Sequence, residues 1–300
     1  MSAPVVSVRN LRKSFRDVGS RRNIDALVDV SFDVHEHGIH GLLGRNGAGK
    51  TTLLQILTGQ QWADDGEVSV FGGSPFENAT VLRDVCFVKE SQRYPDDFRV
   101  SQVLDAAAAI LPRWDEALAR DLMADFDLPR RRKVKKLSRG MTSALGVVVG
   151  LASRAPLTLF DEPYLGLDAV SRQLFYDRLL ADYAEHPRTV VLSTHLIDEV
   201  ADLVDRVVVV DGGRVVVDDD AEQLRGRAVT VSGNADGVAD FTIEHTVLQH
   251  ESMGSMARTT IDGPLSPESL AAARAAGLHV DPVSLQQFVV ASTTRRKVSS

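Results

Sequence analysis

The sequence has few of the features that mark secreted or membrane-spanning chains. Its single cysteine, Cys86, cannot form an intrachain disulfide, so a reducing cytoplasm is the expected compartment. The first residues lack a basic segment followed by an apolar one, and no secretory signal is visible. The longest apolar runs, such as residues 146–152 and 207–210, are far shorter than the roughly 18 residues of a membrane span. Any role at a membrane would therefore depend on a partner.

A strong excess of one charge is also missing. The net charge of -7 argues weakly against non-specific nucleic-acid binding, which needs Lys and Arg to neutralise phosphates. The hydrophobic content of 44% and the charged content of 25% are ordinary for globular proteins, which excludes a disordered or fibrous chain. A length of 300 residues suits one large domain or a domain with an appendage.

The first fifty residues predict strands that lead into a glycine-rich loop. Apolar, β-branched runs at residues 5–9, 28–34 and 39–43 indicate strands. The third run is followed by the pattern G-x-x-x-x-G-K-[ST] and then by an apolar helix that ends near Gly59. The loop and the start of the helix contain Gly44, Arg45, Asn46, Gly47, Ala48, Gly49, Lys50, Thr51 and Thr52.

This loop pattern is typical of phosphate binding. Its glycines let consecutive N–H groups point at phosphates, in line with a helix N-terminus that carries about half a positive charge. Lys50 adds a full charge at the β and γ phosphates, and the Thr51 hydroxyl is a magnesium ligand. The pattern predicts a site for a nucleoside triphosphate with Mg²⁺. A glycine-rich turn that binds nothing is the alternative, and the strand–loop–helix order disfavours it.

Two carboxylates follow the fully apolar run at residues 157–160. Asp161 is predicted to hold magnesium, and Glu162 is predicted to accept a proton from the attacking water. Two adjacent acids could instead be solvated charges at a strand end. Their position between an apolar strand and Pro163 favours a catalytic site.

The remaining sequence indicates an α/β fold. Residues 100–150 show few strand signals and predict helices. Apolar runs at 157–160, 189–192 and 207–210 alternate with helical patterns, which indicates a parallel sheet covered on both faces. We expect a nucleotide-binding domain over residues 1–225.

Residues 226–300 are predicted to form a small α+β appendage. Short runs at 228–231 and 258–261 indicate strands, and a helix is expected from Pro267 to Gly277. A frayed tail is expected after Thr293.

Further motifs resemble the ATP-binding-cassette (ABC) family of transporter ATPases. Residues 137–141, Leu-Ser-Arg-Gly-Met, resemble the LSGGQ signature, with Arg139 and Met141 as departures. Residues 166–168, Gly-Leu-Asp, resemble the D-loop, and residues 193–195, Ser-Thr-His, resemble the switch-histidine loop. The resemblance covers about residues 4–225 and is closest in layout to bacterial, exporter-like ATPase subunits.

The resemblance implies a P-loop NTPase fold of the ABC type, with a mixed or parallel sheet core, an N-terminal antiparallel β subdomain and a helical subdomain at about 92–150. It implies that two such domains pack head to tail, so that Ser138 and Gly140 of one contact the γ-phosphate held by the other. It assigns His195 to the γ-phosphate and the attacking water. It also assigns Phe15 to the segment that presents an aromatic ring to adenine, although Phe15 could instead be a core residue.

The Q-loop is a further departure, because Glu90 stands where the family has glutamine. Gln92 follows two residues later and could serve instead, and the sequence leaves both open as metal-site residues. If Glu90 faces magnesium, it adds negative charge beside Asp161 and Glu162. That charge should strengthen metal binding or hold the loop away until a partner docks, which suggests a partner-gated site.

The side chain of Arg139 has two interpretations. It points either to solvent or toward the phosphates at the interface between two cassettes, where it would stabilise negative charge. The basic run at residues 130–136 is interpreted as a solvated loop that could approach anionic lipid headgroups. A nucleic-acid patch is the alternative, and the lack of interleaved aromatics disfavours it.

The leading hypothesis is an ATP-binding and ATP-hydrolysing subunit that powers transport of an unknown substrate. Its expected partners are separate transmembrane permease subunits and a second ABC ATPase domain, at the cytoplasmic face of the membrane. No specific nucleic acid is expected. Two alternatives stay open: a soluble ABC ATPase that acts on nucleic acid, ribosomes or protein assembly, and a regulatory nucleotide binder without turnover.

Overall fold

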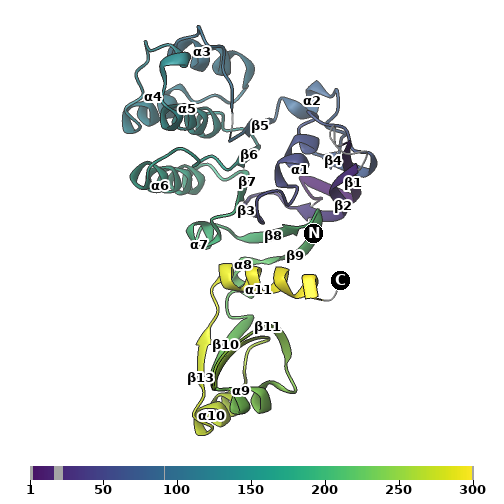
Figure 1. Cartoon of the computed structure of the whole chain (residues 1–300). Helices are drawn as coiled ribbons and strands as arrows, with labels where there is room; N and C mark the ends of the chain where they lie inside the picture. The colour runs from purple at the N-terminus through teal and green to yellow at the C-terminus, as the bar shows by residue number, and fades with distance from the viewer. Residues whose placement is uncertain (1–2, 17–22, 91, 299–300) are drawn as a thin grey trace. The chain divides into compact units, whose positions relative to one another are not determined.

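The computed structural model describes residues 3–16, 23–90 and 92–298 (Figure 1). The chain forms two compact units, Met1–His195 with Val210–Val215, and Leu196–Val209 with Val216–Ser300. The domain boundary expected at residue 225 stays a prediction.

A six-stranded sheet has the order β5-β6-β7-β3-β8-β9. Its strands β5, β6, β7 and β3 are parallel to one another. Every residue of β3, β6 and β7 is buried, as expected for the apolar strands of a parallel sheet that is covered on both faces. The strands are β3 (Gly38–Leu43), β5 (Val85–Val88), β6 (Leu157–Asp161), β7 (Thr189–Thr194), β8 (Arg206–Asp211) and β9 (Arg214–Asp220).

A three-stranded antiparallel sheet has the order β2-β1-β4 and confirms the antiparallel N-terminal subdomain. Its strands are β1 (Val6–Arg16), β2 (Asn23–Val34) and β4 (Asp65–Val70). The first two are longer than the predicted runs at 5–9 and 28–34. The added residues of β1 alternate in part between exposed and buried positions, and those of β2 are mostly exposed, so a search for continuous apolar runs detects neither.

The stretch from residue 100 to 152 is helical, as predicted, and contains α3 (Val100–Ile110), α4 (Glu116–Asp125), the short 3₁₀ helix η1 (Val134–Lys136) and α5 (Arg139–Ala152) (Figure 1). Helix α5 approaches β6 closely because of Gly150. A Cβ atom at that position would lie 2.4 Å from the Phe160 ring. The helices outside this stretch and before the C-terminal elements are α1 (Lys50–Leu57), α2 (Ala79–Leu82), α6 (Ala169–Glu185), α7 (Ile197–Val200) and α8 (Ala221–Leu224).

The C-terminal elements form a β-α-β-β-α-β unit of the ferredoxin-like type, with the antiparallel strand order β11-β12-β10-β13. They are β10 (Ala228–Asn234), α9 (Ala235–Thr242), β11 (Thr246–Met253), β12 (Met256–Asp262), α10 (Pro267–Ala275) and β13 (His279–Pro282), followed by α11 (Leu285–Val298). One face of the sheet packs on α9 and α10. Its buried core contains Val231, Val238, Ala257, Ile261, Ala273 and Leu278.

The sequence correctly predicts β10, β12 and α10, but it misses α9, β11 and β13. The expected frayed tail after Thr293 is wrong, because α11 continues to Val298. Among the described residues, no helix combines the length and the apolar character that crossing a membrane would require.

Candidate functional site

The glycine-rich loop joins β3 to α1, and glycine is required at two of its positions. Gly44 and Gly49 have φ angles of 152° and 108°. A Cβ atom at Gly44 would lie 2.2 Å from the carbonyl oxygen of Val210, and one at Gly49 would lie 2.4 Å from that of Ala26. The loop therefore packs tightly, and it leads directly into the positively polarised N-terminus of α1.

Lys50 is the first residue of α1, and its side chain reaches back along the loop. Its Nζ donates hydrogen bonds to the carbonyl oxygens of Gly44 (2.7 Å) and Arg45 (3.2 Å) and lies 3.6 Å from Glu162 Oε1. Burial lowers the pKa of the Lys50 ammonium, while the Glu162 and Asp161 carboxylates oppose this shift. A buried cation beside a loop of backbone N–H groups is suited to bind a phosphate chain.

Thr51 and Asp161 come together as the sequence predicts for a metal-binding pair. The Thr51 hydroxyl donates to Asp161 Oδ2 at 2.7 Å, and the Ser193 hydroxyl donates to Oδ1 at 2.8 Å. Burial raises the pKa of the Asp161 carboxyl, and these two hydrogen bonds oppose the increase. Hydroxyl and carboxylate oxygens are ligands that suit Mg²⁺. Within the described residues, no group of three His, Cys, Asp or Glu side chains could hold a metal by itself.

Glu162 follows β6 and lies beside His195. Its φ angle of 51° falls in the left-handed region, which costs a non-glycine residue on the order of 1–3 kcal/mol. Both carboxylate oxygens lie 2.9 Å from Nδ1 of His195, and the Glu162 N–H donates to the carbonyl oxygen of Ser193 at 3.0 Å. The structure therefore brings together the three side chains that the sequence predicts as catalytic, Glu162, His195 and Lys50.

Tyr164 is a site residue that the sequence interpretation misses. Its side chain is buried, and its hydroxyl donates a hydrogen bond to Glu162. The same oxygen bonds the Thr194 hydroxyl and lies 3.5 Å from His195 Nδ1. Burial and the adjacent Glu162 carboxylate raise the pKa of the Tyr164 phenol, so it stays protonated and continues to donate. The only sequence signal for this role of Tyr164 is its position directly after Asp-Glu-Pro.

One pocket of about 590 Å³ collects most of the predicted nucleotide-binding residues. Phe15 lies on its wall with 39% of its surface exposed, and Lys13 Nζ lies 5.4 Å from the centre of its ring. The phenyl ring is therefore available to a ligand in the pocket. The predicted residues that line the pocket are Phe15, Asn46, Gly47, Ala48, Gly49, Lys50, Thr51, Thr52, Glu90, Glu162 and His195.

Two predicted residues of the signature segment, Ser138 and Gly140, lie at the start of α5 and are not among the lining residues described for this pocket. Ser138 is the N-cap residue, and its Oγ accepts a hydrogen bond from the Met141 N–H at 3.1 Å. Gly140 packs closely on Gly166, because a Cβ atom there would lie 2.7 Å from the Gly166 carbonyl oxygen.

The structure separates the two Q-loop candidates. Glu90 lines the pocket, whereas Gln92 is not among its described lining residues. The Glu90 carboxylate forms an ion pair with Arg139 at 3.3 Å. Arg139 therefore contacts a carboxylate of its own chain, an arrangement that the sequence interpretation does not foresee.

The basic run at residues 130–136 is partly paired within the chain. Lys133 and Lys135 lie 3.3 and 2.8 Å from Asp97. Their side chains are 42% and 48% exposed. This geometry agrees with the interpretation of the run as a solvated loop.

A family model described as "ABC transporter" matches residues 27–165. A second, described as "AAA domain, putative AbiEii toxin, Type IV TA system", matches residues 130–201. The chain is 30% identical to the ABC transporter ATP-binding protein YtrB of Bacillus subtilis, over 60% of this chain and 62% of that protein. It is 31% identical to the doxorubicin resistance ATP-binding protein DrrA of Mycobacterium tuberculosis, over 74% of this chain and 68% of that protein.

Solved structures agree with these relatives. The structure of an ATP-binding subunit of an ABC transporter has a TM-score of 0.63 and 25% identity, and the match covers 73% of this chain and 91% of that one. A dimeric ATP-binding cassette in a post-hydrolysis state with ADP and phosphate also has a TM-score of 0.63, at 20% identity, over 72% of this chain and 98% of that one. Because its sequence identity is low, this second structure supports the fold of the chain and nothing beyond the fold.

Proposed function

The chain belongs to the ABC transporter family as an ATP-binding subunit with ATPase activity, and we propose that the pocket around Lys50 and Glu162 is its site of ATP hydrolysis. The single observation that carries this proposal is the convergence of Lys50, Thr51, Asp161, Glu162 and His195 at one end of the parallel sheet. ABC cassettes in general dimerise and pair with membrane permease subunits. The substrate and the partners of this chain are part of the proposal.

The loop residues bind the phosphates of ATP. The N–H groups at the start of α1 donate to the phosphates. The Lys50 ammonium gives up its carbonyl acceptors in the loop and binds the β and γ phosphate oxygens instead. Phe15 offers its exposed ring to the adenine base, where stacking contributes about 1–3 kcal/mol. Asn46 and Thr52 line the same pocket, and the Arg45 carbonyl oxygen accepts a hydrogen bond from Lys50 Nζ.

Thr51 and Asp161 would hold Mg²⁺ through their adjacent oxygens, with phosphate and water oxygens as the other ligands. When bound, the ion neutralises the developing charge on the phosphate oxygens. Ser193 keeps the Asp161 carboxylate in place through its 2.8 Å hydrogen bond.

Glu162 acts as the general base for the attacking water. Its carboxylate accepts the water proton while His195 holds the γ-phosphate and the water in line. The Tyr164 hydroxyl fixes the orientation of the Glu162 carboxylate and is therefore a positioning residue. The left-handed backbone at Glu162 aims that side chain toward the end of β7, where Thr194 is the last strand residue and His195 follows.

The signature segment acts across a dimer. Ser138 and Gly140 would contact the γ-phosphate held by a second cassette, through the start of α5. Their placement outside the pocket of their own chain supports this proposal. Binding of ATP then closes the dimer, and loss of the γ-phosphate reopens it.

Glu90, rather than Gln92, is the Q-loop residue in this proposal, because it lines the pocket. The Glu90–Arg139 ion pair holds this extra carboxylate beside the signature helix. A docking partner that separates the pair would change the charge around Mg²⁺, which gives the partner-gated site a physical basis.

The transport partner is a separate membrane-spanning protein, and the chain acts at the cytoplasmic face of the membrane. Export is the proposed direction, because the relative from Mycobacterium tuberculosis carries a name that links it to doxorubicin resistance.

The test compares Mg²⁺-dependent phosphate release by wild-type protein and by Glu162→Gln, each purified with its co-purifying membrane protein. We expect Glu162→Gln to lower the rate at least about 100-fold while the protein still binds ATP. Glu185→Gln, an exposed change at the end of α6, is the matched control and should keep the wild-type rate. A wild-type rate in Glu162→Gln would refute the assignment of the general base.

A further inference from the structure

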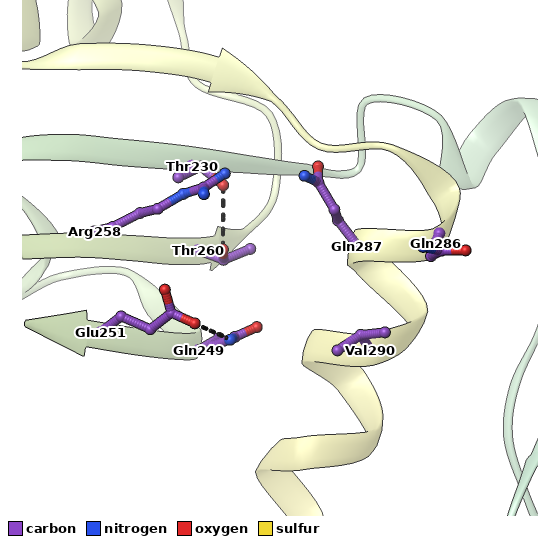
Figure 2. Close-up of a pocket in the computed structure, with 8 residues that line it drawn as sticks. All are labelled: Thr230, Gln249, Glu251, Arg258, Thr260, Gln286, Gln287 and Val290. Carbon is purple, nitrogen blue, oxygen red and sulfur yellow. Dashed lines mark hydrogen bonds between the residues drawn. The ribbon is translucent and has the colours of Figure 1, made fainter. Parts of the chain in front are cut away.

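The C-terminal ferredoxin-like sheet has one apolar face and one polar face. The apolar face contains Val231, Ala257 and Ile261 and packs on α9 and α10. Because successive side chains of a strand point to opposite faces, the neighbouring residues Thr230, Arg258 and Thr260 share the other face. That face carries a pocket of about 220 Å³ near the first turns of α11 (Figure 2).

The pocket is built from two rows of cross-strand neighbours. Thr260 lies opposite both Gln249 and Thr230, and its hydroxyl is 3.2 Å from that of Thr230. In the next row, Arg258 lies opposite Glu251. Figure 2 shows the Arg258 side chain extending toward Thr230, with Gln287 approaching from α11.

Arg258 and Glu251 are neighbours of opposite charge that do not pair. Among the ion pairs of the described residues, none involves Arg258, and Glu251 accepts a hydrogen bond from Gln249 Nε2 at 2.8 Å. Side chains directly opposite in an antiparallel pair have Cβ atoms about 4.5–5.5 Å apart. The pocket therefore offers a guanidinium and a carboxylate on the same face of the sheet, with hydroxyl and amide groups around them.

We propose that this pocket binds a small zwitterion of the α-amino acid class. The Arg258 guanidinium and the Thr230 and Thr260 hydroxyls match a ligand carboxylate, and the Glu251 carboxylate matches an adjacent ammonium group. The ligand must be small, because 220 Å³ lies below the roughly 300–1,000 Å³ of pockets for drug-sized molecules. Gln286 and Gln287 at the start of α11 supply further amide donors and acceptors.

The test is calorimetric titration of the full-length chain with each of the common α-amino acids, without ATP. We expect at least one of them to bind. For that amino acid, Arg258→Gln should weaken binding about tenfold or more, because the ligand carboxylate loses a charge-assisted hydrogen bond. Arg274→Gln, which removes an exposed cation from α10, is the matched control and should bind as the wild type does.

Analogues of the bound amino acid test the two halves of the pocket separately. An analogue that keeps the carboxylate but lacks the amine should bind the wild type more weakly than the amino acid does. The affinity of this analogue should be the same for the wild type and for Glu251→Gln. Melting temperatures of all variants show whether they remain folded. Arg258→Lys is a second variant, which keeps the positive charge and should retain part of the affinity for the amino acid. Absence of binding by every amino acid, or wild-type affinity in folded Arg258→Gln, overturns the proposal. Neither result depends on ATP hydrolysis.

Discussion

The Glu90 carboxylate and the Arg139 guanidinium lie 3.3 Å apart and join two positions at which the sequence departs from the family's pattern. We propose that one belongs to the Q-loop and the other to the signature segment; they are 49 residues apart in the chain. The two side chains are 46% and 72% exposed, and an exposed ion pair of this kind contributes only about 0–1 kcal/mol. A contact this weak can break when a partner or a second cassette approaches.

This ion pair leads to the first prediction, on the isolated chain. Glu90→Gln should raise Mg²⁺-dependent phosphate release several-fold, because it removes the ion pair that holds this loop beside the start of α5. Arg139→Gly should give a comparable gain if it acts by releasing the same pair, and the double variant should add little to either single change. Phosphate release by the three variants measures this coupling. Equal rates in wild type and Glu90→Gln, or turnover by the isolated wild-type chain equal to that of the assembled complex, would contradict a partner-gated site.

Tyr164 supplies the second prediction. Tyr164→Phe keeps the buried ring but removes the hydroxyl that bonds Glu162 and Thr194. We expect kcat to fall about tenfold while KM for ATP stays near the wild-type value, because the hydroxyl orients the proposed general base and Tyr164 is not among the described lining residues of the pocket. Steady-state kinetics measure the two constants. A change confined to KM, or none in either constant, would show that the tyrosine does not position Glu162.

The third prediction concerns the segment before Phe15. The Asp64 carboxylate accepts hydrogen bonds from Lys13 Nζ at 2.7 Å and from the Ser14 N–H at 2.6 Å. The bond from Lys13 is the main reason that the pKa of Asp64 is lowered in the folded protein. A lowered folded-state pKa stabilises the fold above the ordinary value near 3.9, and that stability is lost as the pH falls through the folded-state value.

Asp64→Asn should therefore lower the free energy of unfolding at neutral pH by about 1 kcal/mol, the contribution of one lost hydrogen bond. The difference from wild type should shrink as the pH falls below about 4. Urea unfolding at neutral and acidic pH measures this difference. A constant difference across the pH range would show that the ionised carboxylate is not the stabilising group.

The fourth prediction tests the close contact at the start of α5. Gly140→Ala places a Cβ atom 2.7 Å from the Gly166 carbonyl oxygen, so one of the two backbones must move. We expect a loss of about 1–3 kcal/mol of stability and a strong loss of phosphate release, because the displaced N–H groups are those that we propose to contact the γ-phosphate. Gly237→Ala in α9 is the control, since its Cβ would meet only Leu278 Cδ2 at 3.5 Å. Wild-type activity in Gly140→Ala would argue against that contact.

The sequence predicts the parts of the site that local patterns define. The strand–loop–helix order fixes Lys50 at the start of α1, and the apolar strand before Asp161 places that carboxylate at the sheet edge beside Thr51. It could not predict the role of Tyr164. That contact depends on the left-handed backbone at Glu162 and on the approach of β7, neither of which has a local sequence pattern.

The C-terminal unit shows where periodicity is too weak for prediction. Most residues of β11 are exposed and polar, so the strand lacks the apolar alternation that marks a half-buried strand. Helix α9 contains glycine and threonine, which have low helix propensity, and it is stabilised by packing against β10 and β12. Helix α10, with the cap residue Ser266 and Pro267 at its start, carries a strong local signal.

Calorimetric titration of the folded chain with ATP in the presence of Mg²⁺ tests the proposed ATP site most directly. We expect saturable binding by wild type and by Glu162→Gln, and much weaker binding by Lys50→Ala, because that variant loses the ammonium of the phosphate-binding loop. Absence of ATP uptake by the folded wild-type chain, or equal affinity in Lys50→Ala, would contradict the assignment of this pocket as the ATP site.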